Sequence, residues 1–440
     1  MRVTFSKSKI KETFLFYYSL FLVILLLATA SFGNPNLLYV LIVACVLLFF
    51  QPVYIIPVYF ISSLANSYFL AGEGLGISRF IGIILIVSGL FYLQKNLNIS
   101  NRKNIFYIII ITIFIIFSSA LSKTGSLDAL LLFLQYFTIV IILSQFNNIN
   151  LELLSKLLLF SSIITILVLG FTLRDNLLTI QDERLSAGDD MNVNRFAMMI
   201  AQLGAVLFAG LIIFTKKKIF QLFSLILLLI ALFMIILSGS RSALIGIIGA
   251  MLIIFVFLLK NYTKKVIGPL LIVVVVGYFF LNGVDQLNIP FIDRFTKEGV
   301  NESGGSQERF GIWKELVPIT LSNNPIFGNG FGAQNVIALS KEYGFGKPAH
   351  NFLVDLFLQT GFFGVTLFFS YFIYIGKKIK KYSSEPLILI PLLILLTALL
   401  NGVGETIFPE KLFWNGIALT LLYMNNLKAG IKQQQTLNNI

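Results

Sequence analysis

Charge, cysteine and histidine are all scarce in this 440-residue chain. Only 12% of the residues are charged, against roughly 25% in soluble globular proteins, and 57% are hydrophobic. One cysteine, Cys45, excludes a disulfide within the chain, and together with a single histidine it excludes a Cys/His metal site. The sequence also lacks the Walker A loop of nucleoside triphosphatases, the Gly-x-Ser-x-Gly motif of serine hydrolases and the His-Glu-x-x-His motif of zinc metalloproteases. The composition therefore excludes a soluble enzyme.

Long hydrophobic runs dominate what is present. A membrane span needs about 20 apolar residues, and the chain has about fourteen such runs, so we predict an all-α polytopic membrane protein, a bundle of 12–14 transmembrane helices. The first run follows four basic residues but has no cleavage site, so we expect it to be retained as a span. The predicted spans cover residues 14–32, 37–50, 53–70, 78–94, 105–121, 128–145, 153–172, 195–215, 219–237, 243–259, 265–282, 351–375, 386–402 and 412–426.

The basic residues are distributed unevenly among the loops. Loops on the side of the N-terminus carry 20 of the 33 lysines and arginines and only three acidic residues. Since cytoplasmic loops of membrane proteins are rich in lysine and arginine, both termini are predicted to lie in the cytoplasm. The net charge of +13 is therefore a topology signal, and no nucleic acid is expected as a partner.

Two predicted external segments are too long to be simple turns. Residues 174–194 are rich in charge, and the loop from about residue 283 to 350 is far longer than ordinary helix connections. The chain thus divides into transmembrane helices over 1–282, a large periplasmic loop over 283–350, and C-terminal helices with a cytoplasmic tail over 351–440. Within the loop we predict an amphipathic helix over 306–321, whose apolar side carries Phe310, Trp313, Leu316 and Val317.

Arg241 is the first candidate for chemistry. It lies between two serines in a Gly-containing interruption of two apolar runs, at the predicted outer edge of the membrane. An arginine there is costly without a partner, and its planar fork suits a phosphate or diphosphate. The alternative is an arginine that reaches lipid headgroups or a helix-end carbonyl.

His350 is the second candidate, because a neutral imidazole can accept a proton from a sugar hydroxyl. Either His350 or Asn351 could instead cap the helix that follows. Four further arginines at the outer face are candidate phosphate contacts, although Arg309 and Arg294 each follow an acidic residue and could form ordinary ion pairs. These four are Arg309, Arg195, Arg294 and Arg79.

Several ordered motifs resemble the O-antigen polymerase and O-antigen ligase superfamily. They are Ser238–Gly246 (SGSRSALIG), Arg309–Trp313 (RFGIW), Asn324–Gly332 (NPIFGNGFG), His350 with Asn351, and Gln359–Gly364 (QTGFFG). Where many relatives have Glu, this chain has Gln359, which removes an acid or base role at that position.

The resemblance implies a fold similar to membrane glycosyltransferases of C type, located in the bacterial inner membrane and active at its periplasmic face. Carried over by position, Arg241 and Arg309 hold the diphosphate of an undecaprenyl-diphosphate-linked oligosaccharide, and His350 activates the acceptor hydroxyl. Arg195, Arg294, Arg79 and Asn351 are expected as substrate contacts, no metal or cofactor is expected, and a chain-length regulator and a flippase are expected partners. We favour a polymerase over a ligase; a capsular polysaccharide polymerase, a flippase or transporter, and a scaffolding membrane protein are the alternatives.

Overall fold

The protein is helical throughout the part that the computed structural model describes. That part covers residues 7–32, 35–64, 77–95, 102–121, 127–173, 193–214, 218–256, 305–382, 385–406 and 411–438. No strand occurs within these ranges, so the predicted all-α polytopic fold is confirmed. The helices are α1 (Lys7–Phe32), α2 (Pro35–Val46), α3 (Pro52–Leu64), α4 (Ile77–Lys95), α5 (Arg102–Leu121), α6 (Leu127–Gln145), α7 (Leu151–Thr172), α9 (Val193–Ile213), α10 (Lys218–Leu237), α13 (Gly305–Asn323), α14 (Ala333–Glu342), α15 (Phe352–Lys381), the 3-10 helix η3 (Pro386–Ile388), α16 (Leu389–Asn401) and α17 (Lys411–Asn438).

Seven of the described helices are long and apolar enough to cross a membrane: α1, α4, α5, α7, α9, α10 and α15. Five shorter apolar helices accompany them, among them the one over Arg241–Val256. The predicted span over 265–282 and the charged segment 174–192 lie outside the described residues, so the total of 12–14 spans stays a prediction.

Helix α9 lies at the centre of the bundle. In its spanning window 94% of the residues are buried, and it packs against α7, α10 and α16. The outer helices instead expose large apolar side chains, such as Ile113 of α5 and Ile219 of α10. Apolar surface of this kind is stable in contact with lipid, whereas its exposure to water would be costly.

Helices α13 and α14 form a small cap with its own apolar cluster. Its buried members include Ile312 and Leu316 of α13 and Val336 of α14. The predicted helix is confirmed, but the assignment of Phe310 to its apolar side is wrong, because this side chain is 65% exposed. Ile312 takes the buried position, since it lies four residues before Leu316 and so shares its face of the helix.

The cap is joined to α15 through the main chain. Helix α15 is broken at Gly361, where φ is +61°, and the Gly-rich turn after α13 inserts into the break. Four backbone hydrogen bonds connect the two segments: Asn329 N–H to Leu358 C=O, Gly330 N–H to Gln359 C=O, Phe362 N–H to Pro325 C=O and Phe363 N–H to Ile326 C=O. The side chain of Gln359 adds a fifth, because its Oε1 accepts from Gly332 N–H at 2.9 Å. Gln359 therefore has a structural role here.

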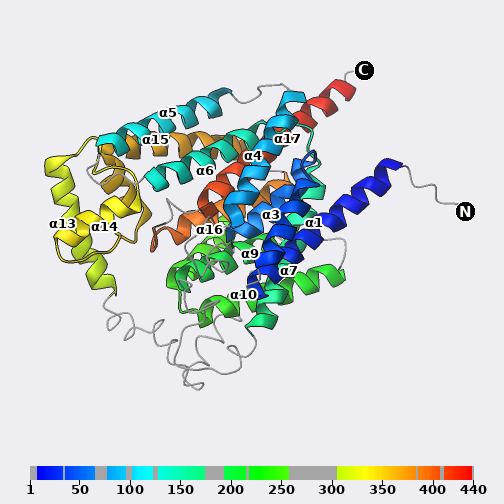
Figure 1. The fold of residues 1–440 in the computed structure, drawn as a ribbon, viewed down its shortest axis with the longest axis horizontal. Coiled ribbons are helices and arrows are strands. Elements are labelled where there is room, and N and C mark those ends of the chain that lie inside the picture. Colours follow the sequence, from blue (N-terminus) through cyan, green and yellow to red (C-terminus); the bar gives the residue numbers. More distant parts are fainter. Residues whose placement is uncertain are drawn as a thin grey trace, which may run out of the picture.

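The cap and the chain ends lie on different sides of the bundle. In Figure 1 the start of α1 and the end of α17 lie on one side, whereas α13 and α14, in yellow, lie on the other. This arrangement agrees with the predicted topology, in which the termini and the large loop are on opposite sides of the membrane.

Candidate functional site

The start of α15 and the loop after α16 are bound tightly to each other. Phe352 N–H donates to the carbonyl of Gly402, and Asn351 Nδ2 donates to the carbonyl of Val403 at 3.0 Å. Thr406 Oγ1 donates to Oδ2 of Asp355, a fully buried carboxylate in the first turn of α15. These bonds fix residues 402–406 beside His350.

The backbone of His350 is held in the left-handed region, with φ at +51°. Its neighbours fix this conformation: Ala349 N–H donates to Asp355 Oδ1 at 3.2 Å, and Ala349 C=O accepts from Trp313 Nε1 at 2.7 Å. On the other side, Asn351 caps α15 by accepting from Leu353 and Val354 N–H. A non-glycine residue in this region costs on the order of 1–3 kcal/mol and persists only where its surroundings impose it, most often at functional sites.

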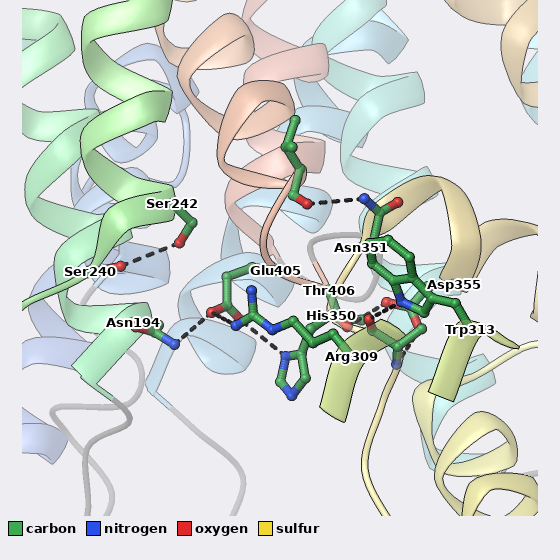
Figure 2. A network of polar contacts seen from close by, with 12 residues as sticks. Asn194, Ser240, Ser242, Arg309, Trp313, His350, Asn351, Asp355, Glu405 and Thr406 are labelled. Carbon is green, nitrogen blue, oxygen red and sulfur yellow. Dashed lines mark hydrogen bonds and ion pairs between the residues drawn. The ribbon is translucent and has the colours of Figure 1, made fainter. Parts of the chain in front are cut away.

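Glu405 is the centre of a polar cluster that four separate segments build (Figure 2). Its Oε1 accepts from Asn194 Nδ2 of α9 at 2.5 Å and lies 3.9 Å from Arg309 Nη2 of α13. Its Oε2 lies 3.4 Å from His350 Nδ1. The side chains of Arg309, His350 and Glu405 are 35%, 27% and 16% exposed, so the cluster is partly open to a ligand.

The Ser238–Ser242 turn borders this cluster. Gly239 has a φ of +64°, Ser240 N–H donates to Ser238 Oγ, and the Ser240 and Ser242 hydroxyls lie 3.3 Å apart. A Cβ atom at Gly404 would lie 3.0 Å from Ser242 Cβ and 3.7 Å from Arg309 Nη1, so Gly404 packs between the turn and Arg309. Arg241, between the two serines, is therefore at the N-terminus of its helix and next to the Glu405 cluster.

A cavity of about 120 Å³ opens beside the cluster. Arg195, an exposed residue in the first turn of α9, lines it together with His350 and Glu405. Its other lining residues are Asn194, Met198, Pro348, Asn401 and Thr406. Three of the predicted site residues, Arg195, Arg309 and His350, thus meet at one end of the bundle, and the turn that carries Arg241 borders them.

The other three predicted contacts have different positions. Asn351 is the helix cap that the sequence allowed as its alternative, with its oxygen on two N–H groups and its amide on Val403. Arg79 lies in the first turn of α4, where its carbonyl accepts from Gln135 Nε2 of α6. Arg294 falls outside the described residues.

Glu405 and Asp355 were missed by the sequence analysis. Asp355 had a signal, since an acidic residue inside an apolar span is costly and marks a specific partner. Glu405 had a weaker one, as an acidic residue in a short Gly-containing connection between two apolar runs. Glu405 comes close to His350 through helix packing over 55 residues of separation, which no local pattern reports, whereas Asp355 lies only five residues after His350.

The cluster combines a group that can move a proton with groups that bind anions. A carboxylate facing one nitrogen of an imidazole orients the ring and leaves its other nitrogen available as a base. Arginines at the rim, two of them at helix N-termini, suit a phosphate or diphosphate. In the described part of the chain, no three His, Cys, Asp or Glu side chains gather as metal ligands.

Comparison with protein families agrees with this arrangement. Residues 226–369 match the family model described as O-antigen ligase, a stretch that contains Arg241, Arg309 and His350 but neither Asn194 nor Glu405. No curated protein matches the chain.

Proposed function

We propose that the chain is an O-antigen polymerase of the O-antigen ligase and polymerase superfamily, a group of membrane glycosyltransferase-like enzymes, because residues 226–369 are similar to the family model described as O-antigen ligase. It joins oligosaccharide repeat units carried on undecaprenyl diphosphate. The observation that carries the proposal is the contact of His350 with Glu405, beside Arg309 and the Arg241 turn.

In the proposed reaction, a hydroxyl oxygen of the acceptor sugar attacks the anomeric carbon of the donor glycan. The bond between that carbon and the diphosphate oxygen breaks, and its electron pair leaves with undecaprenyl diphosphate. Nε2 of His350 takes the hydroxyl proton, while Glu405 facing Nδ1 favours the tautomer with Nε2 unprotonated. A direct displacement of this kind inverts the anomeric configuration.

The arginines stabilise the leaving group. Negative charge grows on the diphosphate as the glycosidic bond breaks, and positive charge already fixed at that point lowers the barrier without reorganisation. Arg309 is held near Glu405 and Arg241 begins a helix, so both can meet an anion that approaches the same end of the bundle. We assign Arg195, at the rim of the cavity, to the same task.

The site is proposed to face the periplasm from the bacterial inner membrane. The excess of basic residues in the opposite loops supports this orientation. In this setting the donor and the acceptor both arrive within the bilayer, delivered by a flippase, and a chain-length regulator is the expected partner of the growing polymer.

An O-antigen ligase is the second candidate, because the matching family model carries that description. It would use the same donor and the same proton transfer, and would differ in its acceptor, a sugar of the lipid A core. The cluster around Glu405 serves either reaction.

A deletion strain distinguishes the two. Lipopolysaccharide from the strain that lacks this gene is separated on a gel, with the wild-type gene and His350→Ala restored as separate complements. Core carrying one repeat unit indicates a missing polymerase, whereas core without any repeat, with long chains retained on undecaprenyl diphosphate, indicates a missing ligase. An unchanged ladder contradicts both.

A further inference from the structure

Asn401 is a buried amide without a hydrogen-bonding partner in the described protein. It ends α16, is fully buried, and neither its Oδ1 nor its Nδ2 forms a hydrogen bond there. An unsatisfied buried polar group costs about 1–3 kcal/mol, so a fold retains one only where something else meets it.

The side chain cannot relax away from this position toward the neighbouring helix. A Cβ atom at Gly246 would lie 3.2 Å from Asn401 Cβ and 2.8 Å from Thr397 C=O, so the Arg241–Val256 helix packs directly against α16 at this level. What remains beside Asn401 is the 120 Å³ cavity that it lines with His350 and Glu405.

The groups around the cavity define the chemistry of its ligand. Asn401 Oδ1 needs a hydrogen-bond donor, whereas Asn401 Nδ2 needs an acceptor. A fully ionised phosphate has only acceptor oxygens and would leave Asn401 Oδ1 without a donor. A hydroxyl donates and accepts at once, and a sugar presents several at neighbouring carbons.

On the basis of the proposed function, we propose that this cavity is the subsite for the acceptor sugar, with Asn401 as its specificity-determining contact. The space equals about four water molecules at roughly 30 Å³ each, which fits one edge of a sugar ring. Asn401 binds a hydroxyl next to the one that His350 deprotonates. The arginines at the rim remain for the diphosphate of the donor.

Asn401→Leu tests the proposal, because leucine has a similar volume and no polar atom. The full-length protein is reconstituted in nanodiscs, and the probe is the lipid-diphosphate-linked repeat unit extracted from the host strain. We expect transfer at low concentrations of this repeat unit, which serves as both donor and acceptor, to fall at least tenfold, mainly through a higher KM, with thermal stability unchanged or raised because no bond within the protein is lost.

Asn426→Leu is the matched control, since Asn426 is a buried amide with three hydrogen bonds to the protein. This variant should lose stability and keep its transfer rate per folded molecule. If Asn401→Leu does not insert, Asn401→Ala, which only removes atoms, takes its place.

Wild-type transfer by the Asn401 variants overturns the inference, as does a loss of transfer that only parallels a loss of stability. An experimental structure with acceptor bound elsewhere and only water at Asn401 overturns it too. If the wild-type protein itself transfers nothing, the proposed function fails, and the subsite falls with it.

Discussion

Two buried asparagines near opposite ends of α16 differ in their hydrogen bonding. Beyond its N-terminal end, Asn426 of α17 accepts from Ile149 N–H at 2.7 Å and donates to the carbonyls of Phe146 and Leu422. At its C-terminal end, Asn401 makes none of these bonds within the described protein. The first asparagine is satisfied by the fold, and the second is left for a ligand.

The same contrast holds for the backbone. Each end has one non-glycine residue with a positive φ, Asn148 at +59° and His350 at +51°. Asparagine adopts the left-handed region readily, because its short side chain bonds locally, so Asn148 is an ordinary turn residue. His350 is instead held there by bonds to both of its neighbours. In these two pairs, the residues whose polar groups the fold satisfies have a structural role, and the residues that it strains or leaves without a partner border the candidate site.

Among the variants that test this contrast, His350→Ala should lower glycan transfer the most. Removing the proposed base should lower glycan transfer by about 10²- to 10⁴-fold, as general bases typically contribute. The amount of inserted protein should stay normal, since the imidazole loses only its partly exposed contact with Glu405. Membrane immunoblots together with the lipopolysaccharide ladder measure both quantities, and a wild-type ladder at native protein level would refute the assignment.

Arg241→Ala is expected to lower transfer by about 10²- to 10³-fold, because fixed charge at the leaving group is lost. Arg241→Lys sharpens the test. An ammonium keeps the charge but not the bidentate fork, so its activity should remain poor. Full complementation by lysine would mean that the side chain supplies charge alone.

Glu405→Gln should lower transfer by about tenfold or more, since the amide keeps the shape of the carboxylate but holds His350 less firmly in one tautomer. Comparing kcat with KM in nanodiscs checks the role, because an orienting group should affect kcat. A change confined to KM would instead make Glu405 a substrate contact.

Asn426→Leu concerns the opposite end and should act only on stability. Its loss leaves Ile149 N–H and two carbonyls without this partner, at a cost of about 2 kcal/mol or more. Thermal unfolding in detergent should show this decrease. If transfer per folded molecule fell as far as in Glu405→Gln, the Asn426 end would also be needed for transfer, and the distinction between a structural end and a functional end would be wrong.

Arg79→Ala should have the smallest effect, below about threefold on transfer. Arg79 lies in the first turn of α4, next to α6. Its backbone carbonyl accepts a hydrogen bond from Gln135 of α6, and alanine retains this carbonyl. A loss comparable to that of Arg241→Ala would show that the donor diphosphate extends to α4.

Much of the fold could be predicted because hydrophobic runs directly report helices in lipid. Local patterns predicted the helix over 305–323 and the break between α2 and α3. They also predicted that Arg241, Arg309 and His350 share one side of the bundle. Phe310 was misplaced because the periodicity of a cap helix does not show which of its two apolar stripes is covered. Glu405 had only a weak local signal and Asn401 was not noticed, since the contacts of both arise where α9, α13, α15 and α16 meet.

The break in α15 has a consequence for how such a protein can diversify. The cap is attached to α15 through peptide groups and through an apolar cluster that includes Leu358 of α15. Within the peptide contact, the positions that demand a particular residue are Gly328 and Gly361, where a Cβ atom would lie 2.4–2.5 Å from backbone atoms. The outward side chains of α13 and α14 can therefore be exchanged without moving His350. The outer surface of the cap can thus vary while the proposed reaction centre stays constant, within one continuous chain.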